Sequence, residues 1–187
     1  FKMEILYTAR GKYNKDNIDN FSWDKYKDWT KMYQLEELVS LDGLLNELLV
    51  EPDYNNDDDW KYIHTFDNYQ TGSFTDVDYI FKRLRRLENY NLLAIAIEPE
   101  QKCDKINLND YDFIGYDLLD QDFGISALTN CGGFDETFSP SEVNTKGLID
   151  DYERAYDIKE KLLINNPDEH HADTNVIAVW RHRTFGK

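Results

Sequence analysis

The sequence predicts an α+β fold, a single domain over residues 1–187 with a mixed, mainly antiparallel sheet and about three helices packed on it. Two apolar runs, NLLAIAI at 91–97 and NVIAVWRH at 175–182, lack polar alternation, as strands covered on both faces do. The segment 146–167 between them carries apolar residues at helical spacing. No glycine-rich phosphate loop joins an expected strand to a helix, which argues against a doubly wound parallel sheet.

The other expected elements follow the chain from its beginning. MEILYTA at 3–9 is a first strand, and the polar, aromatic stretch 12–29 is a loop or a short helix. Apolar residues at three- and four-residue steps predict a helix over 32–49, which Pro52 ends. WKYIHTF at 60–66 alternates as a strand does, and Thr75 caps a helix over 76–89. DFIGYDLL at 112–119 is a strand neighbouring 91–97, and 124–130 stays open between strand and loop.

Charge and cysteine content narrow the classes of function. The chain has 37 acids and 21 bases, a net charge of −16, so phosphate backbones and anionic membranes are unfavourable partners and a basic protein is the complementary one. Two cysteines in 187 residues do not form a disulfide framework, and no run of 18 apolar residues is present. We therefore expect a cytoplasmic, non-enzymatic binding protein without cofactor or metal, and with neither nucleic acid nor membrane as a partner.

Acids gather in two stretches, 51–78 and 104–122, and both interleave them with aromatic residues. Carboxylates attract a Lys/Arg-rich surface and speed association, while burial of large rings slows dissociation. The alternative is that the rings belong to the core and the acids only solubilise loops. The interface hypothesis nominates eight partner-binding residues: Asp57, Asp58, Asp59, Trp60, Tyr116, Asp117, Asp120 and Asp122.

Catalytic and metal chemistry have weaker candidates. His170 and His171 are adjacent, so their side chains diverge and do not chelate one ion. An acyl-transfer site of a hydrolase or transferase would combine Cys131, beside two glycines, with one of these histidines and Asp173. We keep it as the enzyme alternative, although no family signature surrounds that cysteine.

Two charged segments resemble known binding motifs only in part. The segment 53–64 places acids as a calcium loop does, but Asp58 stands where that loop needs glycine and His64 where it needs a bidentate glutamate. The basic cluster 82–86 lies on the polar face of a predicted helix in an acidic chain. We therefore interpret it as a solvated face or as a set of intramolecular ion pairs.

One resemblance points toward a partner. The segments GYDLLDQDFGISALTNCGGF and HHADTNVIAVWR, within residues 110–183, resemble uncharacterised bacterial proteins, and the whole chain is similar to the small acidic immunity proteins of bacteria. That resemblance implies a protein that binds a cognate toxin domain, often a basic nuclease, and blocks its active site. It transfers no functional residue. An acidic adaptor protein unconnected with toxins is the remaining alternative.

Overall fold

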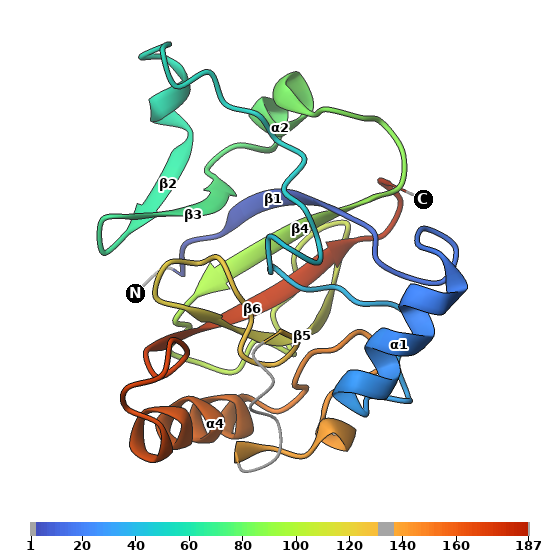
Figure 1. Cartoon of the computed structure of the whole chain (residues 1–187). Coiled ribbons are helices and arrows are strands. Elements are labelled where there is room, and N and C mark those ends of the chain that lie inside the picture. Colours follow the sequence, from blue (N-terminus) through green and yellow to red (C-terminus); the bar gives the residue numbers. More distant parts are fainter. Residues whose placement is uncertain (1–2, 131–136, 187) are drawn as a thin grey trace.

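A six-stranded sheet forms the centre of the computed structural model, which describes residues 3–130 and 137–186 (Figure 1). Its strand order is β2-β3-β1-β4-β6-β5, and each neighbouring pair runs antiparallel. The predicted α+β class is therefore confirmed. The strands are β1 (Leu6–Gly11), β2 (Ile63–Phe66), β3 (Tyr69–Phe74), β4 (Tyr90–Ile97), β5 (Tyr111–Asp120) and β6 (Thr174–His182).

Strands β4 and β6 lie side by side in the middle of the sheet, as their uniformly apolar sequences predict. Successive side chains point to opposite faces of a strand, so both faces of an interior strand must be covered. Leu93 of β4 belongs to one buried cluster, while Ala94 belongs to another together with Trp180 of β6. The register pairs Ala94 with Trp180, which places a small side chain beside a large one.

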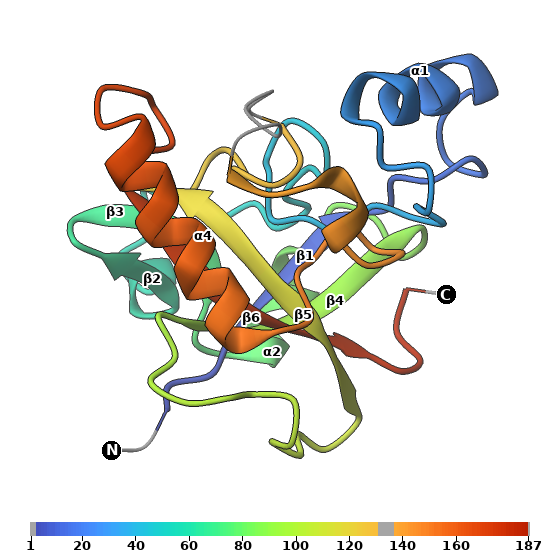
Figure 2. The same ribbon diagram turned by 90° about the horizontal axis from the view of Figure 1, so that it is seen from below.

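Three α-helices are described: α1 (Asn20–Thr30), α2 (Val77–Arg83) and α4 (Tyr152–Asn165). Helix α4 confirms the helix expected within 146–167. The Asp151 carboxylate caps its first turn by accepting the amide of Arg154 at 2.8 Å, and Ala155, Ile158 and Leu162 bury its inner face. It packs on β5 and β6, whereas α1 lies apart from the strands, beyond irregular segments (Figure 2).

Helix α2 is shorter than the predicted 76–89. Asp76 caps it instead of Thr75, since the Asp76 carboxylate accepts the amide of Asp78 at 2.7 Å. Beyond Arg83 the chain pairs with a distant segment, where the amide of Arg85 donates to the carbonyl of Leu49 at 2.9 Å. The backbone after Arg83 therefore forms hydrogen bonds with this distant segment instead of continuing the helix.

The predicted helix over 32–49 is wrong. The structure has turns and isolated bridges there, because side chains form hydrogen bonds with the backbone amides. The Asp42 carboxylate accepts a hydrogen bond from the amide of Leu44 at 2.8 Å, and the Asn46 side-chain oxygen accepts one from the amide of Ser40 at 3.2 Å. The apolar residues of this segment enter three separate buried clusters instead of one helical face. The segment therefore crosses the sheet as an irregular layer.

A buried polar network holds that irregular layer on the sheet. The Arg10 guanidinium, 3% exposed, donates to the carbonyl of Leu41 at 2.9 Å. Burial lowers the pKa of Arg10 to about 10, and the nearby carboxylates of Asp117 and Asp42 act in the opposite direction. Buried charges require partners, so Arg10 of β1 and Asp117 of β5 hold residues 32–49 in a fixed position against these two strands.

Candidate functional site

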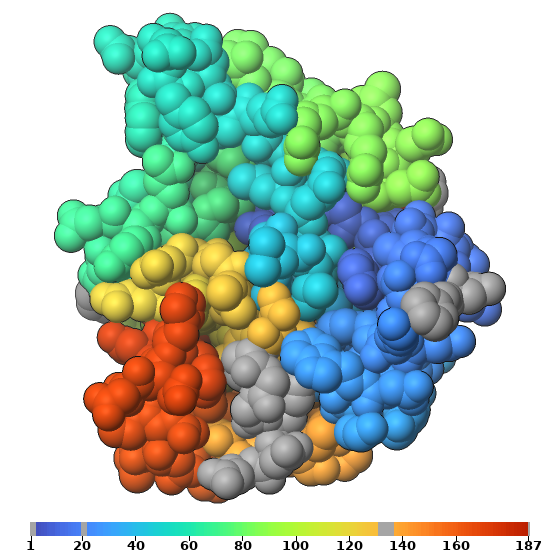
Figure 3. Space-filling model, in the orientation of Figure 1, coloured from blue at the N-terminus to red at the C-terminus, as the bar shows by residue number. Residues whose placement is uncertain are grey.

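Segment 53–61, which contains the short 3-10 helix η1 (Asp59–Lys61), leads into β2 and projects from the molecule (Figure 3). Asp59 anchors it from inside. Its side chain is 2% exposed and accepts the Asp53 amide at 2.8 Å, the Tyr79 hydroxyl at 2.8 Å and the Arg83 guanidinium at 2.9 Å. Burial raises the pKa of this carboxyl, but the bonds from Asp53, Arg83 and Tyr79 outweigh it and set the pKa at about 2. The predicted partner contact by Asp59 is therefore wrong, because its oxygens are occupied inside the protein.

Further hydrogen bonds fix the path of this segment. The Asp53 carboxylate accepts the amide of Asn55 at 3.0 Å, and the Asn56 side chain accepts the amide of Asp58 at 3.0 Å. The indole of Trp60 donates to the carbonyl of Tyr54 at 3.1 Å. Short polar side chains that satisfy nearby backbone amides stabilise turns. These bonds within the segment therefore fix its conformation.

Two large rings lie on the outer side of this segment. Tyr54 and Trp60 are 51% and 44% exposed, with ring centroids 5.5 Å apart. The Tyr54 hydroxyl donates to the Gln70 side chain on β3 at 3.3 Å, and the exposed ring of Tyr69 belongs to the same strand. Half-exposed aromatic side chains held by hydrogen bonds are typical of contact surfaces, since little side-chain freedom remains to be lost on binding.

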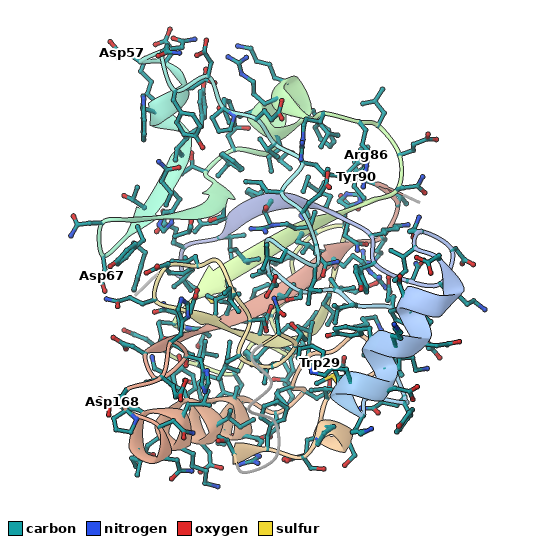
Figure 4. All side chains as sticks on the ribbon, in the orientation of Figure 1. Trp29, Asp57, Asp67, Arg86, Tyr90 and Asp168 are labelled. Atoms are coloured by element: carbon teal, nitrogen blue, oxygen red, sulfur yellow. The ribbon has the colours of Figure 1, made fainter. Side chains whose placement is uncertain are left out.

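Exposed carboxylates stand next to these rings. Asp57 lies at the tip of the projection (Figure 4), and Asp58 is exposed beside it. Lys61 bonds to Asp58 at 2.5 Å and lowers the pKa of that carboxyl below its ordinary value. We call the exposed part of this segment, formed by Tyr54, Asp57, Asp58 and Trp60, the acidic aromatic surface.

The second predicted group is mostly buried. Tyr116 is 1% exposed and its hydroxyl accepts the amide of Cys103 at 2.8 Å, so it is a core residue. Asp117 is fully buried and accepts hydrogen bonds from two hydroxyls and two backbone amides, including Ser126 at 2.6 Å and Leu41 at 2.9 Å. Burial raises the pKa of Asp117, and these bonds counteract the rise. Partner contacts by Tyr116 and Asp117 were wrongly predicted, because both side chains lie inside.

Asp120 is also interior, whereas Asp122 is exposed as expected. The Asp120 carboxylate, 2% exposed, accepts the amide of Gly124 at 2.8 Å and lies 3.1 Å from Nδ1 of the exposed His170 ring. Its predicted role at a partner interface is wrong because its oxygens serve this turn. Phe123 and Phe66 bring the two acidic stretches into contact, with ring centroids 5.9 Å apart.

The exposed acids nominated in the two stretches, Asp57 and Asp58 in one and Asp122 in the other, do not form one patch. Asp57 lies at one end of β2, and Asp67, in the turn that joins β2 to β3, lies at the other (Figure 4). The contact between Phe66 and the second stretch is at the Asp67 end. Through this contact the second stretch meets the Asp67 end of β2, whereas Asp57 lies at the opposite end.

The candidates for catalysis are not assembled by the described residues. His170 is held by Asp120 instead of Asp173, and His171 is buried at 8% exposure. Cys131 lies outside the described residues. Within 3–130 and 137–186, no group of three His, Cys, Asp or Glu side chains is arranged to hold a metal ion.

The basic cluster 82–86 forms intramolecular ion pairs. Arg83 binds Asp59 at 2.9 Å, and Arg85 reaches Glu47 at 3.1 Å and Glu51 at 3.3 Å. The interpretation of this cluster as internal pairing is confirmed for those two arginines. Arg83, at the end of α2, thereby ties the segment that carries the acidic aromatic surface to this helix.

Comparisons with known proteins return no family model, curated protein or solved structure that matches this chain. None of the helices in the described part of the chain has the length and apolar character needed to cross a bilayer.

Proposed function

We propose that the protein is a non-enzymatic binding protein that docks the acidic aromatic surface onto a basic region of another protein. The most concrete form of this function is that of a bacterial immunity protein, which neutralises a cognate toxin domain. One observation carries the proposal: Tyr54 and Trp60 are half exposed yet held by hydrogen bonds, directly beside the charged Asp57 and Asp58.

Physical chemistry assigns different roles to the acids and the rings. The net charge of −16 attracts a basic partner over long range, and Asp57 and Asp58 at the tip add a local negative field. The rings act after contact, because their burial removes apolar area from water. A fixed segment loses little conformational entropy on docking, so more of the contact energy appears as affinity.

The first experiment examines charge. The chain is expressed with the protein encoded immediately upstream, and complex formation and relief of toxicity are measured. We expect the double variant Asp57→Asn/Asp58→Asn to slow association about threefold to tenfold at roughly 0.02 M salt, and less at roughly 0.3 M. The matched control is Asp24→Asn/Asp28→Asn, which removes the same charge from exposed positions on α1.

The outcomes of that experiment separate the alternatives. Equal association rates for both double variants would refute docking through this surface. A complex without any toxicity to relieve would favour the acidic adaptor over the immunity protein. Enzymatic turnover that is lost on Cys131→Ser, with the fold intact, would favour the hydrolase or transferase alternative.

A second experiment examines the rings. Trp60→Ala removes a side chain with roughly 100 Å² of exposed area, worth up to about 2.5 kcal/mol on complete burial. We therefore expect dissociation to accelerate by up to about 70-fold. Trp29→Ala is the matched control, since Trp29 on α1 is 50% exposed against 44% for Trp60. Similar dissociation rates for the two variants would contradict the proposed anchor.

A further inference from the structure

A hollow of about 400 Å³ opens at the edge of the sheet formed by the start of the chain, β2 and the end of β4. It is separate from the acidic aromatic surface, whose segment leads into β2. Its apolar lining includes Leu6, Phe66 and Ile97. Leu6 is 2% exposed and belongs to one buried cluster, and Phe66 and Ile97 pack against that cluster. The apolar part of the hollow is therefore continuous with the packed core.

The other walls carry hydrogen-bond acceptors. Glu4, Glu98 and Glu100 line the hollow, and no lysine or arginine of the described chain does so. Lys159 and the amide of Val176 both donate to Oε1 of Glu98, at 2.6 Å and 2.7 Å, which fixes this carboxylate in place. Negative groups around an apolar surface suit a ligand with a cationic head and an aliphatic stem.

His64 completes the acceptor set. Burial lowers its pKa, so the imidazole is neutral at pH 7. The Thr71 hydroxyl lies 3.1 Å from Nδ1 of His64, 3.3 Å from the carbonyl of His64 and 2.5 Å from the Ser73 hydroxyl. Whether its proton goes to the carbonyl or to Ser73, the Thr71 oxygen is left to accept a proton from Nδ1, and we infer this tautomer. Nε2 then presents a lone pair. It stands 3.8 Å from Oε2 of Glu4, too far for a hydrogen bond, so two acceptors face each other without a donor between them.

We propose that this hollow binds a guanidinium or primary ammonium group on an aliphatic stem. The N–H groups of the cation bridge Nε2 of His64 and the Glu4 carboxylate, and Glu100 adds a second unpaired negative charge, whereas Glu98 is already paired with Lys159. The stem packs on Phe66 and the neighbouring apolar walls. The chemistry is the same for a free small amine and for an arginine or lysine side chain of another protein. This proposal does not depend on the acidic aromatic surface.

The test compares two ligands of nearly equal shape, n-butylguanidinium and the uncharged n-butylurea, by NMR titration of the whole chain. We expect n-butylguanidinium to bind with a millimolar Kd and to shift the resonances of the His64 ring and of residues 97–101, while the urea binds at least tenfold more weakly. Similar affinities for the two ligands would overturn the proposal, because the acceptors would then contribute nothing. Shifts spread over acids elsewhere on the protein would also overturn it.

Variants locate the site. Glu4→Gln/Glu100→Gln removes two charges from the hollow and is expected to weaken n-butylguanidinium binding at least fivefold. The matched control is Glu36→Gln/Glu169→Gln, which removes two exposed charges elsewhere and is expected to change the affinity less than twofold. An equal loss in both double variants would show attraction by net charge alone and refute a built site.

Two further ligands distinguish the sources of the cation. Agmatine represents a free amine, and N-acetyl-arginine methylamide represents a side chain attached to a peptide backbone. Tighter binding of the arginine derivative indicates that the hollow receives a side chain of another protein, whereas tighter binding of agmatine indicates a small molecule. Binding of neither would overturn the proposal.

Discussion

The hydroxyl of Tyr79 offers a direct test of how the acidic aromatic surface is held. Tyr79 is 4% exposed, donates to the Asp59 carboxylate at 2.8 Å and stacks on Tyr62 with ring centroids 4.6 Å apart. Tyr79→Phe removes the hydroxyl and keeps the stacked ring. A hydrogen bond to a charged group contributes about 1.5–3 kcal/mol, so we expect the free energy of unfolding to fall by that amount. With m of about 2 kcal/mol per M, the urea midpoint falls by roughly 1 M.

Amide hydrogen exchange identifies the residues whose protection falls when Tyr79→Phe lowers the stability. The Asp53 amide, which donates to the same Asp59 carboxylate, is expected to lose protection first, because the segment opens locally when its anchor weakens. Tyr62→Phe is the matched control within the same stacked pair and is expected to leave exchange at Asp53 unchanged. A Tyr79→Phe variant with the parent urea midpoint and the parent exchange rate would refute the anchoring role of Asp59.

Two further substitutions examine the polar network beneath the irregular layer. Asp117→Ala leaves four buried donors without their acceptor and removes a carboxylate near the buried Arg10, so we expect a loss of about 3–5 kcal/mol in urea unfolding; a loss below about 1 kcal/mol would contradict the network. Gly72→Ala places a Cβ 2.7 Å from the Arg10 guanidinium at a φ of +65°, and thermal unfolding is expected to show a loss of about 1–3 kcal/mol.

The sequence predicts those elements whose local pattern and tertiary environment agree. Residues 91–97 and 175–182 are uniformly apolar and lie in the middle of the sheet, and α4 has both a helical apolar face and an aspartate cap. Strand β3 was not predicted, although Asp67 and Asn68 supply a signal for the hairpin that contains it. Both adopt positive φ, at 46° and 71°, and such residues are favoured in tight turns between antiparallel strands.

The segment 32–49 shows why spacing alone is insufficient. Its apolar residues recur at helical intervals, but Asp42 and Asn46 bind the backbone and divert the chain from a helix. Short polar side chains compete with helical hydrogen bonds in this way. Whether that competition succeeds depends on buried partners such as Arg10, which lies more than thirty residues away. A local pattern does not contain that information.

The candidate site was predictable only in part for the same reason. Asp58 and Asp59 are neighbours in one acidic run, yet the first is exposed and the second is buried against Arg83. Tyr116 and Asp117 likewise resemble a surface pair but enter opposite layers of the structure. The hollow lined by Glu4, His64 and Glu98 unites three distant segments, and no spacing in the sequence connects them.

The pKa of Asp59 is lowered and that of Asp117 is raised, so the two carboxyls are expected to change the stability in opposite directions as the pH falls. The folded-state pKa of Asp59 is about 2, below its ordinary value of 3.8, so its contribution to stability is complete above about pH 5 and is lost as the pH falls toward 2. The folded-state pKa of Asp117 lies above 3.8, so the folded protein takes up this proton first and acidification through that range favours folding.

The comparison of Asp59→Asn with the parent chain isolates the first contribution from those of the other acids. Urea unfolding at pH 6, 5, 4, 3 and 2 is expected to show a stability difference that is constant between pH 6 and 5 and shrinks steadily below pH 4. Asp117→Asn is expected to show the opposite trend, because removing a carboxyl with a raised pKa relieves a penalty that exists only at higher pH. If the stability differences of the two variants changed with pH in the same direction, the two pKa shifts would have the same sign. That result would contradict the roles assigned here to the contacts of Asp59 and Asp117.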